Sequence, residues 1–227
     1  MKDKILVVVA HPDDEILGVG GTMILHVDSG DEMRVMLLTS GGLGSSSAEE
    51  LRDQSEECAR FIGVSKVYYC GFPDQHLEIK PLIEIIQAIE RVIAEYEPDV
   101  VYTHYHGDLN IDHRITSNAV LTAVRPNKKK NVQRIYTFPV NSSSEWTSPF
   151  PETTFIPNVY VDISTCLEKK IKAFEIYRRE KREFPHPRSI EGIRVAAARE
   201  GMNAGMKAAE SFALIRELKY YNQNRLP

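Results

Sequence analysis

The sequence has few cysteines, and none of them form a pair. Its 227 residues include three cysteines, Cys58, Cys70 and Cys166, which lie far apart and make no Cys-x-x-Cys motif. An odd, scattered set argues against a disulfide framework and against a thiolate metal site. The cysteines therefore favour a cytoplasmic protein with reduced thiols.

Long apolar runs and basic stripes are also missing. No segment approaches the roughly 20 apolar residues that cross a bilayer, and the first apolar run, Ile5–Val9, is too short for a signal peptide. The formal net charge is -4, and the only basic run, Lys128–Lys130, is typical of a solvated loop. We therefore expect a soluble, cytoplasmic protein with no membrane span and no nucleic-acid partner.

The first half of the chain alternates apolar strand-like runs with helical patterns, and its composition suits a globular core. We predict strands at 5–9, 33–39, 66–70 and 100–102, and helices at 16–27, 49–61 and 81–96. Repeated βα units of this length indicate a mainly parallel sheet with right-handed crossovers.

The second half is less regular. We predict helices at 113–124 and 167–179, strands at 132–140 and 159–163, and a long helical segment at 190–218. No internal repeat or long linker divides the chain, so we expect one domain over residues 1–227. Within it, residues 1–125 form the βα core, and residues 126–227 supply variable strands and C-terminal helices.

A dense polar cluster follows the first predicted strand. The segment Ala10-His11-Pro12-Asp13-Asp14-Glu15 comes directly after Ile5–Val9, a continuous β-branched and aliphatic run that indicates a buried strand. Ligands bind at the carboxyl edge of open α/β sheets. The histidine and the two adjacent aspartates are therefore candidates for a functional site.

A second polar cluster, Thr103–Arg114, follows the fourth predicted strand. Imidazole nitrogen and carboxylate oxygen are ligands of borderline divalent ions, and a catalytic zinc keeps three protein ligands and one open position for water. Two histidines and one aspartate from the two clusters supply that number. The other aspartate of the Asp13–Asp14 pair would then remain available as a base.

Three segments together resemble a known family. Ala10–Glu15, Gly20-Gly21 and Asp112-His113-Arg114 are similar to the motifs of the LmbE-like, or PIG-L, zinc-dependent N-deacetylases. The similarity extends through residue 125. It implies a Rossmann-like α/β domain, with a mainly parallel sheet and helices on both faces. It also implies hydrolysis of the acetyl group from an N-acetylglucosamine-type amino sugar, which could be free, nucleotide-linked or part of a conjugate.

Carried over position by position, the resemblance implies that His11, Asp14 and His113 bind Zn²⁺, although such a set accepts other divalent ions. Asp13 is then the general base, which takes a proton from metal-activated water and returns it to the leaving amine.

Arg52 and Asp74 match positions that hold sugar hydroxyls in relatives. Arg52 could equally pair with Glu56 one helical turn further on, and Asp74 could cap its own turn. Arg188, in the proline-bounded segment before the last helical region, could contact a substrate phosphate or simply lead into a helix. We expect substrate specificity to come from residues 141–157 and 184–189.

Asn110 departs from the family pattern. Many relatives carry a histidine at this position, three residues before the second metal histidine, where it helps to stabilise the oxyanion. The Asn110 amide can donate a hydrogen bond but cannot carry a charge. Either this amide fills the role, or Tyr105 or His106 does, with Asp112 orienting Asn110 or a metal ligand.

Other functions remain open on the sequence alone. Gly18-x-Gly20-Gly21 suggests a dinucleotide-binding oxidoreductase, but that fingerprint normally begins directly at the strand end, and no acidic residue ends the second strand. An amidase acting on a thiol conjugate would use the same metal residues. A non-catalytic binding protein would have no use for Asp13. A homo-oligomer is compatible with the helical segment at 190–218, which could form an interface.

Overall fold

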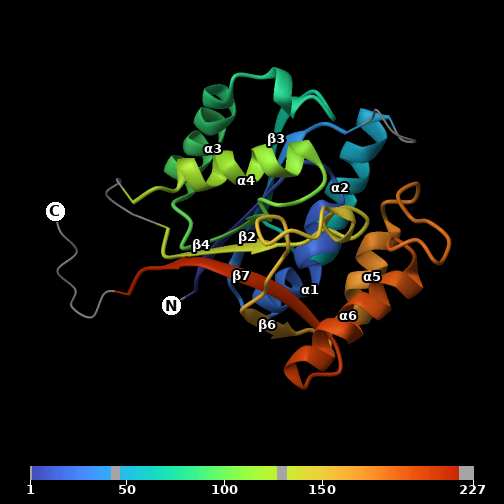
Figure 1. The fold of residues 1–227 in the computed structure, drawn as a ribbon. Coiled ribbons are helices and arrows are strands. Elements are labelled where there is room, and N and C mark those ends of the chain that lie inside the picture. Colours follow the sequence, from blue (N-terminus) through green and yellow to red (C-terminus); the bar gives the residue numbers. More distant parts are fainter. Residues whose placement is uncertain (1, 42–46, 127–131, 220–227) are drawn as a thin grey trace.

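A computed structural model describes residues 2–41, 47–126 and 132–219. Its centre is a seven-stranded sheet with the strand order β3-β2-β1-β4-β5-β7-β6 (Figure 1). The strands are β1 (Lys4–Val9), β2 (Glu32–Thr39), β3 (Lys66–Phe72), β4 (Val100–His104), β5 (Arg134–Phe138), β6 (Val159–Asp162) and β7 (Ala209–Glu217). The α-helices are α1 (Asp14–Asp28), α2 (Ala48–Ile62), α3 (Leu82–Tyr96), α4 (Ile111–Ala123), α5 (Leu167–Glu175) and α6 (Ile190–Ala204).

The order of the strands changes side at β1: the chain first adds β2 and β3 on one side of β1 and then β4 and β5 on the other. Strand β1 pairs in parallel with both β2 and β4, β3 adds outside β2, and β5 adds outside β4. Ligands of open α/β sheets bind in the crevice at such a switch point, beyond the carboxyl ends of the strands. The residues that follow Val9 and His104 therefore meet at one edge of the sheet.

Helices cover both faces of the sheet (Figure 1). Ile5, Val7 and Val9 of β1 pack in the core shared with α1, α2, α5 and α6, while Leu6 and Val8 pack in the core shared with α3 and α4. Successive side chains of a strand point to opposite faces, so β1 has to be apolar at every position. The predicted fold, a mainly parallel sheet between two helical layers, is confirmed.

The predicted helical segment at 190–218 is wrong in its second half. Helix α6 ends at Ala204, where Gly205 adopts a left-handed conformation with φ 72° and caps the helix. The chain then forms β7, which pairs antiparallel with β5 on one side and β6 on the other. These pairings on both sides override the helix propensity of the alanines, glutamates and leucines there. The long C-terminal helix on which we placed a candidate subunit interface does not form.

Two other predicted helices differ from the structure only in where they begin or end. Helix α5 ends at Glu175 rather than Arg179, and α4 begins at Ile111 rather than His113. The basic run Lys128–Lys130 lies outside the described residues. In the three described stretches, no helix combines the length and the apolar character that crossing a membrane requires.

Candidate functional site

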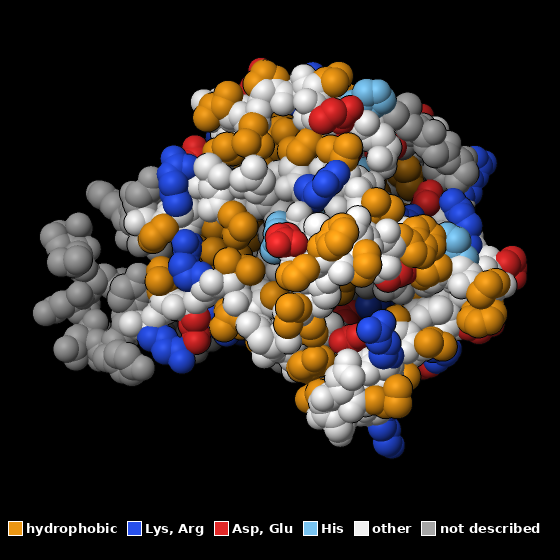
Figure 2. Space-filling view, viewed as in Figure 1, with side chains coloured by type: hydrophobic (Ala, Val, Ile, Leu, Met, Phe, Trp, Pro, Cys, Tyr) orange, Lys and Arg blue, Asp and Glu red, His pale blue; other side chains and the backbone are white. Residues whose placement is uncertain are grey.

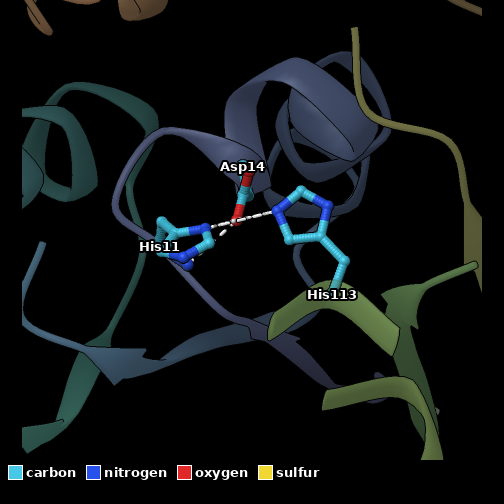
Figure 3. Close-up of side chains that lie close together, drawn as sticks. All are labelled: His11, Asp14 and His113. Atoms are coloured by element: carbon cyan, nitrogen blue, oxygen red, sulfur yellow. Dashed lines mark hydrogen bonds and ion pairs between the residues drawn. The ribbon is translucent and has the colours of Figure 1, made fainter. Parts of the chain in front are cut away.

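Three side chains converge at the switch point between β1 and β4. His11 lies in the turn after β1, Asp14 begins α1 and His113 lies in the first turn of α4; all three point toward one another (Figure 3). His11 Nδ1 is 3.2 Å from Asp14 Oδ2 and 3.2 Å from His113 Nε2, and His113 Nε2 is 3.3 Å from Asp14 Oδ2. Ligand atoms of a tetrahedral zinc lie about 3.3–3.4 Å apart, given the usual bond lengths. The triangle therefore has the size that a zinc ion needs.

The chemistry of this trio also fits a divalent cation. Asp14 is fully buried, and its Oδ1 has no hydrogen-bond partner among the described residues. Burial alone would raise the pKa of Asp14, but the neighbouring His113 and the hydrogen bond from His11 outweigh it and hold the pKa well below the usual range. Two imidazole nitrogens that face each other beside a carboxylate need a shared cation or a proton between them. A metal ion satisfies all of these atoms together.

Asp112 and Asp74 lie against the other nitrogen of His11. His11 Nε2 is 3.1 Å from Asp112 Oδ2 and 3.3 Å from Asp74 Oδ1. The backbone N–H of Leu77 donates to Asp112 Oδ1 at 3.0 Å, which fixes that carboxylate. A carboxylate on the outer nitrogen of a metal-binding histidine sets the tautomer and the orientation of the ring. His11, Asp74 and Asp112 also bring ligand atoms close enough to hold an ion themselves.

The electrostatics around His11 favour a positive charge. Burial lowers the pKa of His11, but its hydrogen bonds to Asp112 and Asp14 and the nearby charge of Asp74 raise the pKa overall, to about 10. The surrounding carboxylates therefore stabilise a cation at this position.

Asp108 supports His113 in the same way that Asp112 supports His11. Its Oδ1 is 3.2 Å from His113 Nδ1, and it accepts hydrogen bonds from the Ser143 and Ser144 hydroxyls and from the backbone N–H of Asn110. We did not predict this role. Asp108 belongs to the polar segment after β4, but the two serines come from the stretch after β5, and nothing in the sequence links them to it.

Replacing Asp108 with asparagine is expected to lower zinc affinity by about 10- to 100-fold, the usual cost of losing an outer partner of a metal ligand. The affinity can be measured by competition with a chromogenic chelator. Asp53→Asn, on the exposed side of α2, is the matched control. An unchanged affinity in Asp108→Asn would remove Asp108 from the metal centre.

His104 packs behind His113. The two rings stack with centroids 4.0 Å apart and an interplanar angle of 11°. His104 Nε2 accepts the backbone N–H of Ala10 at 2.9 Å. Burial, together with the nearby His113, lowers the pKa of His104 to about 4. His104 is therefore a neutral packing partner whose Nε2 is already engaged.

Asp13 is held beside the trio in an unusual backbone conformation. Its φ is 103°, in a region that costs a non-glycine residue about 1–3 kcal/mol. Its carbonyl accepts the N–H groups of Ile16 and Leu17, both at 3.0 Å, and its N–H donates to Glu15 Oε2 at 3.1 Å. Burial raises the pKa of Asp13 to about 8, although the charge of Arg188 opposes the shift. Strain of this kind persists where the surrounding structure fixes it, which is typical of functional sites.

Arg188 reaches Asp13 from the loop before α6. Its Nη1 donates to Asp13 Oδ2 at 3.0 Å and lies 3.3 Å from Glu180 Oε2, while its Nε donates to Ser142 Oγ at 2.7 Å. Arginine pairs of this kind are shorter and stronger than neutral hydrogen bonds. The structure thus places Arg188 against Asp13, a contact that neither of our two interpretations of this residue included.

Glu15 was also missed as a site residue. It is buried, and besides the Asp13 N–H its carboxylate accepts the Tyr177 hydroxyl at 2.5 Å. Burial raises the pKa of Glu15 to about 7. Glu15 therefore fixes the backbone of Asp13 from inside the protein.

The two residues predicted to hold sugar hydroxyls lie in different surroundings. Asp74 is buried beside His11. Arg52 leaves 61% of its side chain exposed, lies 3.5 Å from Glu56 and covers the ring of Tyr69 at 4.5 Å. The side-chain contacts that the structure gives Arg52 are thus the ion pair with Glu56 and the cation–π contact with Tyr69.

Asn110 lies at the rim of the site as the N-cap of α4. Its Oδ1 accepts the backbone N–H of Asp112 at 2.8 Å, and its Nδ2 is 3.4 Å from Gln75 Oε1. Gln75 Nε2 in turn lies 3.2 Å from His11 Nε2. The carbonyl of the Asn110 amide is therefore committed to the helix, while its Nδ2 contacts Gln75, which in turn contacts His11.

The alternatives to Asn110 are placed differently. The Tyr105 hydroxyl donates to the Thr154 carbonyl at 2.9 Å, and the tyrosine is buried. His106 is exposed, and its ring meets the ring of Tyr105 edge to face. The Tyr105 hydroxyl is therefore already engaged by the Thr154 carbonyl.

The glycines of α1 serve packing rather than a phosphate. A Cβ at Gly18 would lie 2.1 Å from the ring of Phe138, so only glycine lets the helix approach β5 this closely. The N-terminus of α1, where a dinucleotide pyrophosphate would bind, instead carries Asp13, Asp14 and Glu15. The pKa of Asp14 is held well below its usual range, so its negative charge would repel the phosphates, which disfavours the oxidoreductase interpretation.

Comparison with known proteins identifies the family. A model described as "PIG-L: GlcNAc-PI de-N-acetylase" matches residues 6–124, which is more than half of the chain. The chain belongs to the PIG-L family. This stretch of the PIG-L protein contains β4, the converging side chains of His11, Asp14 and His113, and Asp13.

Relatives of this PIG-L protein are deacetylases by name. The diacetylchitobiose deacetylase of Thermococcus kodakarensis is 30% identical over 195 residues, covering 80% of this chain and 70% of that protein. The probable N-acetyl-alpha-D-glucosaminyl L-malate deacetylase 2 of Bacillus cereus is 26% identical over 191 residues, covering 78% and 84%. The solved N,N'-diacetylchitobiose deacetylase of Pyrococcus horikoshii superposes with a TM-score of 0.76 at 26% identity, covering 94% of this chain and 84% of that one.

Proposed function

We propose that this PIG-L protein is a zinc-dependent hydrolase that removes the acetyl group from an N-acetylglucosamine-type amino sugar. The observation that carries the proposal is the convergence of His11, Asp14 and His113 within 3.2–3.3 Å of one another, with the buried Asp13 next in sequence to Asp14. Family membership and the names of the relatives support it.

His11, Asp14 and His113 would hold the zinc ion. When bound, zinc supplies a Lewis acid that lowers the pKa of water and polarises a carbonyl. Asp13 takes the proton of the attacking water at one carboxylate oxygen and later gives it to the leaving amine. Its raised pKa, about 8, suits a group that must both accept and return a proton near neutrality.

Arg188 and Asn110 would complete the site. Arg188 holds Asp13 Oδ2 at 3.0 Å and is itself fixed by Ser142 and Glu180, so it orients the base. Arg188 also places a permanent positive charge at the site. In many relatives the position of Asn110 holds a histidine instead. The Asn110 amide N–H would donate to the acetyl oxygen as negative charge develops on it.

An acetate-release assay tests the proposed function. Free N-acetylglucosamine, its nucleotide-linked form, its malate glycoside, diacetylchitobiose and N-acetylated thiol conjugates are offered to the purified protein, and released acetate and free amine are quantified. We expect turnover of at least one amino sugar, loss of turnover after chelation and recovery with zinc. Hydrolysis of the thiol conjugates alone would establish the amidase alternative, and no acetate release from any amino sugar would contradict the proposal.

Substituting Asn110 with serine separates its two roles. Serine is as good an N-cap as asparagine, so thermal stability is expected to stay the same. The amide N–H is lost, and turnover is expected to fall by about tenfold to a thousandfold. A serine variant with wild-type turnover would mean that Asn110 only caps α4.

A further inference from the structure

Two rings lie together outside the metal site. The indole of Trp146 meets the imidazole of His186 edge to face, with centroids 5.7 Å apart and an interplanar angle of 89°. Trp146 is the only tryptophan of the chain, and 53% of its surface is exposed. An aromatic ring that is held at one edge and open to solvent over more than half its surface offers a flat binding surface.

Each ring belongs to a loop whose inner residues support the catalytic centre. Trp146 ends the 3₁₀ turn Ser144–Trp146, and its N–H donates to the Ser143 carbonyl at 3.2 Å. The hydroxyls of Ser143 and Ser144 bind Asp108, the partner of His113. The inner end of this loop thus lies at the metal trio and its outer end carries the tryptophan.

The second loop has the same arrangement. Arg188 contacts Asp13, and the Arg188 backbone N–H donates to His186 Nδ1 at 3.1 Å. The His186 N–H donates to the Glu183 carbonyl at 3.0 Å, and its carbonyl accepts the Ser189 N–H at 2.9 Å. Each ring therefore follows or precedes by two residues a side chain that contacts the centre, Ser144 in the first loop and Arg188 in the second.

His186 presents a hydrogen-bond donor at this surface. Because its Nδ1 accepts a hydrogen bond, the neutral ring carries its proton on Nε2. Burial, with the charges of Arg188 and Arg182, lowers the pKa of His186, so the ring is neutral near pH 7. The pair thus combines a flat apolar face with an N–H donor.

The two loops that carry the pair also expose other apolar side chains. Trp146, Phe150 and Ile156, all between β5 and β6, are each more than half exposed, as is Phe184, two residues before His186. Figure 2 shows hydrophobic side chains gathered in the middle of this face, where Figure 1 places the segment between β5 and β6. Exposed apolar groups at the edge of a site are typical of ligand contacts.

We propose that Trp146 and His186 form a second sugar subsite, which binds a hexopyranose ring linked to the acetylated amino sugar. The C–H face of the pyranose would stack on the indole, and a ring hydroxyl would accept the His186 Nε2 hydrogen. The inference rests on the proposed function for the first sugar. It specifies the substrate as a disaccharide or larger glycoside rather than a free monosaccharide.

Because Trp146 is the sole tryptophan, intrinsic fluorescence reports on this subsite directly. The zinc-loaded protein is titrated with chitobiose, the fully deacetylated disaccharide, and separately with glucosamine. We expect a saturable change in tryptophan emission with the disaccharide and none with the monosaccharide at the same concentrations. Equal responses to both sugars, or no response to either, would overturn the proposal.

Kinetics provide the second test. Trp146→Ala is expected to raise KM for diacetylchitobiose by about three- to tenfold, the value of one aromatic contact, and to leave kcat and the KM for N-acetylglucosamine near wild type. Trp146→Phe should recover part of the loss. Phe61→Ala removes an exposed aromatic side chain from α2, outside the two loops, and is the matched control.

The outcomes separate this proposal from its rivals. Equal KM changes for both substrates would make Trp146 part of the first sugar site. If the wild-type protein is a dimer and Trp146→Ala makes it monomeric without changing the KM for the disaccharide, the two rings form a subunit contact instead. If the wild-type protein deacetylates sugars and Trp146→Ala behaves identically, the subsite fails and the proposed function stands. If the disaccharide alters the fluorescence but nothing is deacetylated, the function fails and the subsite stands.

Discussion

Asp13→Asn is expected to lower turnover by about a hundredfold to ten-thousandfold, the usual cost of removing a general base. The amide has nearly the shape of the carboxylate, and its oxygen can still accept the hydrogen bond that Arg188 donates to Asp13 Oδ2. The fold and the metal trio should therefore remain intact, and the bound zinc should stay at about one ion per chain. Acetate release and elemental analysis of the same preparation provide both measurements.

Asp53→Asn is the matched control for this variant, since Asp53 is exposed on α2 and its substitution makes the same chemical change. We expect wild-type turnover from it. Near wild-type turnover in Asp13→Asn would contradict the assignment of Asp13 as the base. Loss of zinc together with turnover would instead show that Asp13 holds the metal site together.

His113→Ala is expected to lose both zinc and activity. Removing the imidazole leaves His11 Nδ1 and Asp14 Oδ2 as the remaining pair of the trio, and two protein ligands do not hold zinc tightly. The loss of affinity should exceed the 10- to 100-fold that an outer partner such as Asp108 contributes. Competition with a chelator measures the affinity, and acetate release measures the activity.

His106→Ala is the matched control, because it removes a histidine from the same segment. His106 is exposed, and among the described residues its ring contacts only the ring of Tyr105, edge to face. The variant should keep its zinc. Full zinc occupancy and turnover in His113→Ala would remove His113 from the metal centre.

The first half of the fold could be predicted because its signals are local. Five consecutive apolar residues at Ile5–Val9 mark a strand buried on both faces, and the structure has β1 there. The cluster after Val9 and the cluster after β4 follow neighbouring parallel strands, so the topology alone brings His11, Asp14 and His113 to one edge. No knowledge of side-chain packing was needed for that step.

The partners of these residues could not be predicted because they are brought together only by the tertiary fold. Arg188 meets Asp13 across 175 positions of the chain, and Ser143 meets Asp108 across 35. Both arrive on loops without periodic patterns. Strand β7 was missed for a related reason. Its pairing with β5 and β6 is what makes it a strand, whereas its composition alone suits a helix.

The position of the metal tests the account most directly. Crystals of the zinc-loaded protein, measured at the zinc absorption edge, give an anomalous difference map that locates the ion without reference to activity. We predict one peak bonded to His11 Nδ1, Asp14 and His113 Nε2, the atoms that already form the triangle of 3.2–3.3 Å. A peak on the other side of His11, bonded to its Nε2 with Asp74 and Asp112, would contradict the assignment.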